Sequence, residues 1–232
     1  QTDGSTPFRL NLHVGDVGHT LILGQTGGGK SVLLGTLACQ WRKYINKKTG
    51  IEKPARVYFF DKGSSSRVLT NAVGGKFYFL GEDEMSFQPL AYIDNEFERE
   101  WARDWIFSIL EQEGMTLNPE NKKAVWEAIS NLSTKEAKFR TMSSFHAICQ
   151  DSKVKETIEA FTIKGANGRY FDGSENTVKN DRWQVFEMEN IFDSKMLFSM
   201  LTYLFHRIET ELFPSENTPM EKMIPTYMIL DE

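Results

Sequence analysis

The sequence Gly24-Gln25-Thr26-Gly27-Gly28-Gly29-Lys30-Ser31 matches the pattern G-x-x-x-x-G-K-S/T at every fixed position. A short apolar run at residues 20–23 precedes it and predicts a strand, and apolar residues at helical spacing follow it over residues 31–47. A strand, a glycine-rich loop and a helix in this order indicate a phosphate-binding loop, because glycines let backbone N–H groups converge on phosphate oxygens. The alternative is a glycine-rich turn that carries Lys30 and Ser31 by chance.

The residue types in this loop predict how a nucleoside triphosphate would be bound. Lys30 is expected to reach the β and γ phosphates, and the Ser31 hydroxyl is expected to bind Mg²⁺. The first turn of the helix adds a partial positive charge and unpaired backbone donors. The expected nucleotide-binding residues are Gly24, Gln25, Thr26, Gly27, Gly28, Gly29, Lys30, Ser31 and Val32. The predicted cofactors are therefore ATP and Mg²⁺, although no base-reading motif in the sequence distinguishes ATP from GTP.

A second motif, Tyr227-Met228-Ile229-Leu230-Asp231-Glu232, lies far along the sequence. Its apolar residues predict a buried parallel strand, which would deliver an acid to the carboxyl edge of the sheet beside the phosphate-binding loop. Asp231 is expected to bind Mg²⁺ directly or through water, and Glu232 to activate the attacking water as a general base. An apolar run that ends in Asp-Glu is a weak motif alone. The complete phosphate-binding loop upstream favours this interpretation, with Lys30 and Glu232 as the catalytic residues.

Asp61 and Lys62 follow another apolar run, residues 56–60, and are expected at the same edge of the sheet. Two interpretations are open. Asp61 is either a polar contact to the bound phosphates or to a neighbouring subunit, or it is an ordinary solvated strand end.

The remaining pattern predicts an α/β fold. Apolar runs at residues 8–14, 76–80 and 183–188 indicate further strands, and residues 197–212 have the spacing of an amphipathic helix. From residue 95 to about residue 161 the pattern is helical, and we interpret Trp101 and Trp105 as core residues. The predicted organisation is an ATPase core with a mainly parallel sheet, interrupted by an all-α insertion. Residues 1–94 begin this core, residues 95–165 form the insertion, and residues 166–232 continue the core to the strand before Asp231.

The composition, with 40% apolar and 25% charged residues in 232, is that of an ordinary globular protein and excludes a wholly disordered or coiled-coil chain. The formal net charge of −5 argues against non-specific nucleic-acid binding but does not exclude a local basic channel. Cys39 and Cys149 have no metal-ligand spacing and are expected to be buried apolar side chains. No apolar run has the length of a membrane span and residues 1–7 lack a signal-peptide core, so we expect a cytosolic fragment.

Several short motifs, in order along almost the whole sequence, resemble the conjugative-transfer ATPases of type IV secretion systems, the TrbE/VirB-type family. They are residues 19–24, which lead into the phosphate-binding loop, Phe60-Asp61-Lys62-Gly63, Gly74-Gly75-Lys76-Phe77, Phe87-Gln88-Pro89-Leu90, Glu100-Trp101, Gly168-Arg169-Tyr170-Phe171-Asp172, Phe186-Glu187-Met188-Glu189 and Leu201-Thr202-Tyr203-Leu204-Phe205-His206-Arg207. The phosphate-binding loop is shared by many families, whereas this ordered set is specific.

The resemblance implies a RecA/FtsK-like P-loop NTPase motor with a helical insertion before the Walker B strand. It implies an ATPase subunit, hexameric in the full-length protein, at the cytoplasmic face of the bacterial inner membrane. Such a subunit energises pilus assembly and substrate transfer, with inner-membrane secretion-channel subunits and a coupling protein as partners and direct DNA binding left open. By position, Lys30 and Ser31 become the nucleotide-binding pair, and Asp231 and Glu232 the Mg²⁺ and water-activating pair. The resemblance also places a polar sensor residue and an arginine finger beyond Glu232.

Two other functions are open from the sequence. A related FtsK/HerA-like ATPase would translocate DNA, and its DNA affinity would fall steeply with salt concentration. A nucleotide-gated structural subunit of the same apparatus would use ATP to fix its assembly, so a variant unable to hydrolyse ATP would still support transfer.

Overall fold

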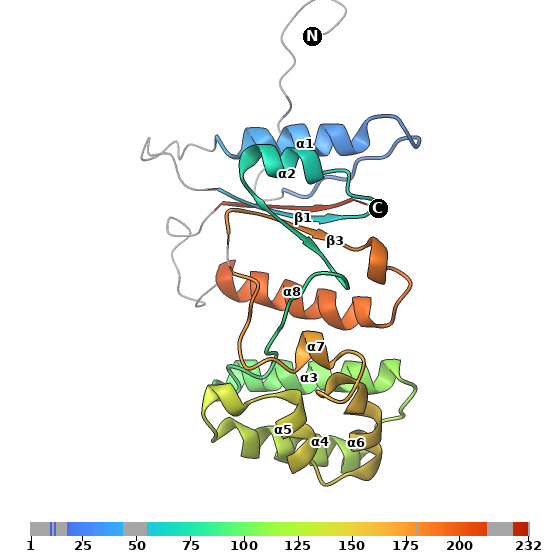
Figure 1. Ribbon diagram of the computed structural model, residues 1–232, viewed down its shortest axis with the longest axis vertical. Helices are drawn as coiled ribbons and strands as arrows, with labels where there is room; N and C mark the ends of the chain where they lie inside the picture. Colours follow the sequence, from blue (N-terminus) through green and yellow to red (C-terminus); the bar gives the residue numbers. More distant parts are fainter. Residues whose placement is uncertain are drawn as a thin grey trace, which may run out of the picture.

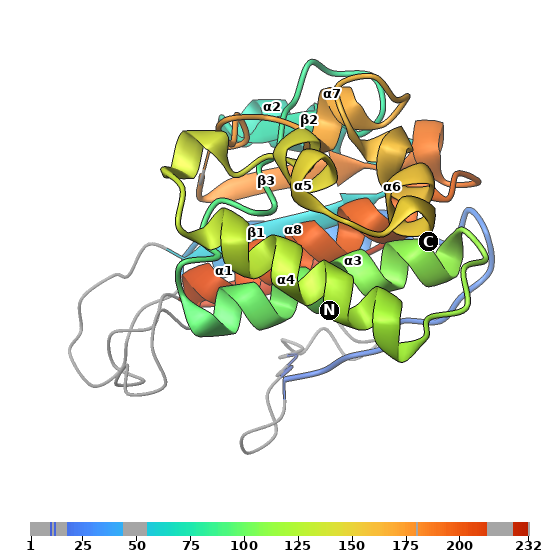
Figure 2. The same ribbon diagram turned by 90° about the horizontal axis from the view of Figure 1, so that it is seen from below.

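The computed structural model describes residues 10, 12, 18–43, 55–179, 181–212 and 225–231. These residues form a sheet with helices on both faces, and a second group of helices lies beyond the helix that covers the lower face (Figure 1). Figure 2, which is seen from below, shows this second group in front of the sheet.

The sheet in the described residues contains four strands in the order β2-β3-β1-β4. They are β1 Arg56–Asp61, β2 Lys76–Phe79, β3 Trp183–Glu187 and β4 Thr226–Leu230. All neighbouring pairs are parallel. Asp61 pairs with Glu187 and Phe60 pairs with Leu230, so the carboxyl ends of β1, β3 and β4 lie level. The parallel sheet with its helices confirms the predicted α/β fold class, in which ligands bind at the carboxyl ends of the strands.

Both faces of β1 and β3 are buried. In β4, Met228 and Leu230 are 38% and 66% exposed, so the strand before Asp231 is less buried than predicted. The helices that cover the sheet are α1 Lys30–Trp41 and α2 Arg67–Val73 on one face and α8 Met196–Leu212 on the other (Figure 1). Val57 and Phe59 of β1 join the core beneath α1 and α2, which includes Ala38. Tyr58 and Phe60 point to the opposite face and join the core with α8. Burial on both faces explains why β1 and β3 are apolar runs in the sequence.

The chain between β2 and β3 is rich in helices. They are α3 Glu96–Gln112, α4 Pro119–Ser133, α5 Met142–Ile148, α6 Ser152–Ile158 and α7 Gly168–Phe171, with single 3-10 turns at Ala137–Phe139 and Glu159–Phe161 and, after β3, at Glu189–Ile191. Asn95, Asn118, Thr141 and Asp151 cap the first four of these helices, because their side chains accept backbone N–H groups of the first turn. No helix within the described ranges is both long enough and apolar enough to cross a membrane.

Two tryptophans hold α3 on α8. Trp105 is buried, and its indole N–H donates to the Ser199 carbonyl oxygen at 3.1 Å. Trp101 stacks on Trp105 with ring centroids 5.9 Å apart, and on His206 of α8 with centroids 3.9 Å apart. The predicted packing role of both tryptophans is therefore confirmed, and it joins the helical group to the helix that covers the sheet.

The strand predicted at residues 20–23 is wrong. These residues have no strand structure, and Leu21 and Leu23 are 81% and 82% exposed. Their apolar side chains satisfy the local pattern, but a strand also needs a hydrogen-bonded neighbour, which a local pattern cannot supply. The helix predicted over residues 31–47 extends in its described part from Lys30 to Trp41. Residues 44–54 and most of the predicted strand at residues 8–14 lie outside the described residues.

Candidate nucleotide-binding site

Glycines set the conformation of the loop before α1. Gly27 and Gly29 have φ angles of 78° and 86°, in the left-handed region that favours glycine. A Cβ on Gly28 would lie 2.9 Å from the Gln25 carbonyl oxygen, which accepts the Gly28 N–H at 3.0 Å. A Cβ on Gly27 or Gly29 would meet nothing within 4 Å, so the loop borders open space. The loop is therefore tightly turned at Gly28, and the space beside Gly27 and Gly29 has room for a phosphate group.

The first turn of α1 faces this open space. Its N-cap is Gly29, no side chain caps the turn, and the turn contains no acidic residue. Leu33 begins the intrahelical ladder by donating its N–H to the Gly29 carbonyl oxygen at 2.9 Å. Lys30, Ser31 and Val32 are the first three residues of the helix, whose backbone N–H groups have no acceptor within an α-helix. Such a turn favours an anion through its donors and its dipole.

The Lys30 side chain folds back over the loop. Its Nζ atom lies 3.1 Å from the Gly24 carbonyl oxygen and 3.4 Å from the Gln25 carbonyl oxygen. A phosphate in the loop would offer the ammonium group a charged acceptor, and charge-assisted hydrogen bonds are roughly twice as strong as neutral ones. Lys30 therefore lies where its ammonium group can exchange neutral acceptors for an anionic ligand.

α1 runs antiparallel to β4 and brings the loop to the carboxyl edge of the sheet. Trp41 at the end of the helix packs against Tyr227 near the start of the strand, with ring centroids 5.7 Å apart. The 12 residues of α1 and the 5 residues of β4 have similar lengths, about 18 Å and about 17 Å. The start of α1 and the end of β4 consequently lie at the same end of the molecule (Figure 1).

An acidic residue stands at the carboxyl end of three adjacent strands. Asp61 ends β1, Glu187 ends β3 and Asp231 directly follows β4. These residues are 0%, 2% and 7% exposed. The Asp231 N–H donates to the Phe60 carbonyl oxygen at 2.9 Å, so Asp231 is held by the β1–β4 ladder. Buried carboxylates require hydrogen-bond donors, and the loop after β1 provides them.

Asp61 holds the start of α2. Its Oδ2 atom accepts the Ser66 N–H at 2.8 Å and the Ser66 hydroxyl at 2.6 Å, and its Oδ1 atom accepts the Ser65 hydroxyl at 2.7 Å. The interpretation of Asp61 as a solvated strand end is wrong, because the residue is fully buried. A contact of Asp61 with phosphates or with a neighbouring subunit stays a prediction.

Glu187 holds the preceding part of the same loop. Its Oε1 atom accepts the Gly63 N–H at 3.0 Å and the Glu189 N–H at 3.0 Å, and its Oε2 atom accepts the Ser64 N–H. Gly63 and Ser64 both have positive φ angles, 88° and 57°, which turn their successive N–H groups toward one carboxylate.

The donor set at this edge fits ATP with Mg²⁺. Ser31 and Asp231 would supply hydroxyl and carboxylate oxygens, which are ligands that Mg²⁺ prefers. Mg²⁺ commonly combines one or two protein ligands with nucleotide phosphates. The glycine loop leaves open space for the phosphates beside the first turn of α1. Glu232 lies outside the described residues, so its general-base role stays a prediction.

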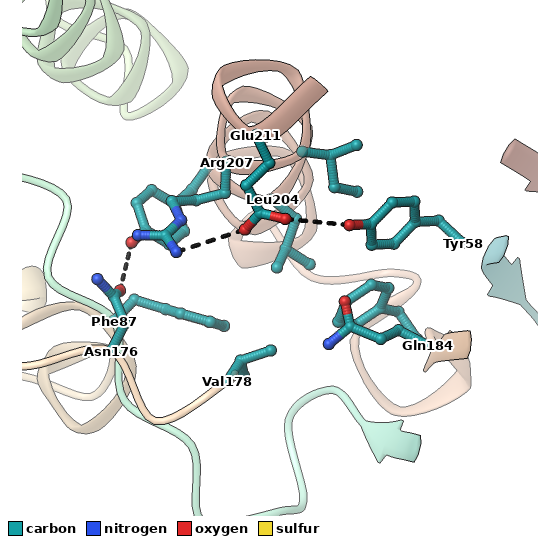
Figure 3. A pocket seen from close by; sticks show the side chains of 11 residues that line it. Tyr58, Phe87, Asn176, Val178, Gln184, Leu204, Arg207 and Glu211 are labelled. Carbon is teal, nitrogen blue, oxygen red and sulfur yellow. Dashed lines mark hydrogen bonds and ion pairs between the residues drawn. The ribbon is translucent and has the colours of Figure 1, made fainter. Parts of the chain in front are cut away.

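A cavity of about 20 Å³ lies elsewhere, between α8 and the sheet (Figure 3). Tyr58 donates its hydroxyl to Glu211 at 3.1 Å across it, and Arg207 lies 3.6 Å from the other oxygen of Glu211. A cavity of this size has room for about one water molecule. It is therefore part of the packing beneath α8 and has no room for a nucleotide.

The sequence reasoning missed Ser65, Ser66 and Glu187 as parts of the carboxyl edge. A signal for Glu187 was present, because three apolar strands are each followed by an acid: Phe60-Asp61, Phe186-Glu187 and Leu230-Asp231. The two serines carry no signal of their own, since a Gly-Ser-Ser-Ser stretch is equally typical of any helix start.

The chain matches several curated proteins along most of its length, although no family model matches it. It is 35% identical to a probable conjugal transfer protein TrbE of Sinorhizobium fredii, over 99% of the chain and 33% of that protein. It is 36% identical to the conjugal transfer protein TrbE of Rhizobium radiobacter, over 99% of the chain and 27% of that protein. It is 27% identical to the type IV secretion system protein virB4 of Bartonella henselae, over 90% of the chain and 26% of that protein. The chain thus spans about a third or less of the length of these relatives.

One solved structure, of VirB4 of Thermoanaerobacter pseudethanolicus, superposes with a TM-score of 0.61 at 14% identity. The match covers 90% of this chain and 59% of that chain. At this identity the likeness establishes a common fold. Together with the curated relatives, it confirms the resemblance inferred from the sequence motifs.

Proposed function

We propose that this chain, a homologue of the TrbE and VirB4 ATPases of type IV secretion systems, hydrolyses ATP in a motor that energises conjugative pilus assembly and substrate transfer. The observation that carries the proposal is the glycine loop at residues 24–29. It borders open space, leads into a helix N-terminus without a side-chain cap and lies at the sheet edge where Asp231 follows β4. This arrangement supports binding of a nucleoside triphosphate with Mg²⁺.

The residues at this edge have distinct roles in the proposed reaction. Lys30 binds the β and γ phosphates, and Ser31 and Asp231 provide oxygen ligands for Mg²⁺. Bound Mg²⁺ supplies positive charge that neutralises the transferring phosphate group. Glu232 orients a water molecule for in-line attack on the γ phosphate and accepts its proton. Rate enhancement comes mainly from positioning and from stabilisation of charge.

The names of the relatives place those proteins in conjugal transfer and in type IV secretion. We extend this setting to the present chain as part of the proposal. The motor would be a hexamer, peripheral to the cytoplasmic face of the bacterial inner membrane. Its partners would be secretion-channel subunits of that membrane and a coupling protein.

Nucleotide binding and hydrolysis by purified variants test the proposal. Lys30→Ala should abolish binding of ATP, because the loop loses the ammonium group proposed to bind the β and γ phosphates. Lys76→Ala is the matched control, since Lys76 is an exposed lysine at the start of β2. Glu232→Gln should keep ATP binding and lose turnover. Wild-type turnover by the Glu232→Gln protein would refute the assignment of the general base.

A second measurement separates a secretion motor from a DNA translocase. DNA affinity is measured from low to physiological salt, where a translocase that contacts several phosphates loses orders of magnitude in affinity. We expect no DNA binding at low salt, in keeping with the net charge of −5. Tight, salt-sensitive DNA binding would overturn the secretion motor in favour of DNA translocation.

A further inference from the structure

The loop between β1 and α2, residues 62–66, connects the carboxyl ends of three neighbouring strands. We propose that Ser65 in this loop is a positioning residue for Asp231, and that its hydroxyl sets the orientation in which the Asp231 carboxylate meets Mg²⁺. This inference rests on the proposed function, because it assigns Asp231 to the metal site of a nucleotide-hydrolysing motor.

The Ser65 hydroxyl lies between two carboxylates. Its Oγ atom is 2.7 Å from Oδ1 of Asp61 and 3.3 Å from Oδ2 of Asp231. A hydroxyl has one proton to donate, so Ser65 serves the two acceptors with a single donor. The shorter distance assigns the stronger hydrogen bond to Asp61, and the longer contact leaves Asp231 able to give its lone pairs to a cation. Ser65 therefore orients Asp231 without competing strongly for its oxygens.

The position of Ser65 is fixed from both sides. On one side, Ser66 donates its N–H and its hydroxyl to Asp61. On the other side, Gly63 and Ser64 donate their N–H groups to Glu187. Ser64 has a φ of 57°, which is uncommon for a residue other than glycine and persists where the surroundings determine it. A loop held at both ends by buried carboxylates can hold a small hydroxyl at a defined place.

Exposure distinguishes Ser65 from its neighbour. Ser66 is 4% exposed, and its hydroxyl satisfies Asp61 within the core. Ser65 is an exposed residue at the edge where α1 begins, so its side chain is not needed to fill the core. Both hydroxyls donate to Asp61, but the contact with Asp231 belongs to Ser65. This difference makes Ser66 a matched control for Ser65.

Metal affinity provides the test. Mn²⁺ replaces Mg²⁺, and its binding to the chain with the non-hydrolysable ATP analogue AMP-PNP is followed by electron paramagnetic resonance. Ser65→Ala should weaken Mn²⁺ binding about tenfold, the lower range for loss of a group that orients a metal ligand. Binding of AMP-PNP with EDTA present should be unchanged. Ser65→Thr keeps the hydroxyl and should restore the affinity for Mn²⁺.

Comparison with Ser66→Ala and with the parent protein distinguishes a positioning role of Ser65 from a general loss of stability. Ser66→Ala should lower the midpoint of unfolding and leave the Mn²⁺ affinity of the folded protein at the parent value. Equal Mn²⁺ affinities of Ser65→Ala and the parent would overturn the positioning role, as would equal weakening by Ser65→Ala and Ser66→Ala. Failure of the parent to bind AMP-PNP would instead refute the proposed function, and the positioning role with it.

Discussion

Glu187 is a buried carboxylate that accepts three backbone N–H groups, and replacing it by glutamine tests whether it holds the loop of residues 62–66 in place. A glutamine oxygen in the position of Oε1 keeps the hydrogen bonds from Gly63 and Glu189, now to a neutral acceptor. Its NH₂ group then faces the Ser64 N–H, so two donors oppose each other. Loss of the charged acceptor of the Ser64 N–H costs about 1.5–3 kcal/mol. Weakening of the hydrogen bonds from Gly63 and Glu189 brings the expected loss of stability to about 3 kcal/mol.

Urea unfolding measures this loss. With an m-value of roughly 3 kcal/mol/M, the midpoint of Glu187→Gln should fall by about 1 M urea. Glu189→Gln is the control, because Glu189 is exposed in the adjoining turn and its replacement should change stability by less than about 0.5 kcal/mol. Hydrogen exchange adds a local measurement, since the amides of Gly63 and Ser64 should exchange faster only in Glu187→Gln. Equal midpoints of the two variants would show that the Glu187 carboxylate does not hold the loop.

Two further predictions concern the phosphate-binding loop and the core. Gly28→Ala places a Cβ 2.9 Å from the Gln25 carbonyl oxygen, so the loop must shift and should lose about one backbone contact to phosphate. Calorimetry should then show ATP binding that is weaker by about tenfold or more. Gly24→Ala meets only an ordinary contact at 3.6 Å, and a larger loss there would contradict the reasoning. Burial, followed by the Glu211 carboxylate, raises the pKa of the Tyr58 phenol from 10.0 to about 12, so the stability it contributes is complete below pH 10 and is lost as pH rises toward 12. The free energy of unfolding should therefore fall less steeply over this range in Tyr58→Phe than in the parent, and equal slopes in urea titrations would argue against it.

The elements whose signal is local could be predicted from the sequence. The strand predicted from the apolar run before Asp231 is β4, Thr226–Leu230. The helix predicted over residues 197–212 is α8, Met196–Leu212. A strand in a sheet between helices leaves an apolar run, even in β4, where Ile229 is buried and Leu230 is exposed. A helix on a sheet leaves an apolar stripe. The same reasoning identified the glycine loop, because the φ angles of Gly27 and Gly29 are conformations that glycine favours.

The contacts that organise the carboxyl edge could not be predicted, because they join distant parts of the chain. The Gly63 N–H and the Glu187 carboxylate are 124 residues apart in the sequence, and Ser65 and Asp231 are 166 residues apart. A local sequence pattern does not determine the order of the strands in the sheet. The strand expected at residues 20–23 was wrong for the same reason, since a strand depends on its neighbour as much as on its own residues.

The order of the strands bears on how the protein is made. Val57 of β1 pairs with Trp183 on one side and with Tyr227 on the other, so β1 lies between two strands that a ribosome synthesises much later. At about 5–20 residues per second, the interval is on the order of ten seconds. During that time both edges of β1 lack their native partner strands, which favours aggregation. Pairings of such high contact order also slow folding, so nascent chains of this protein should depend on chaperones until β4 has been made.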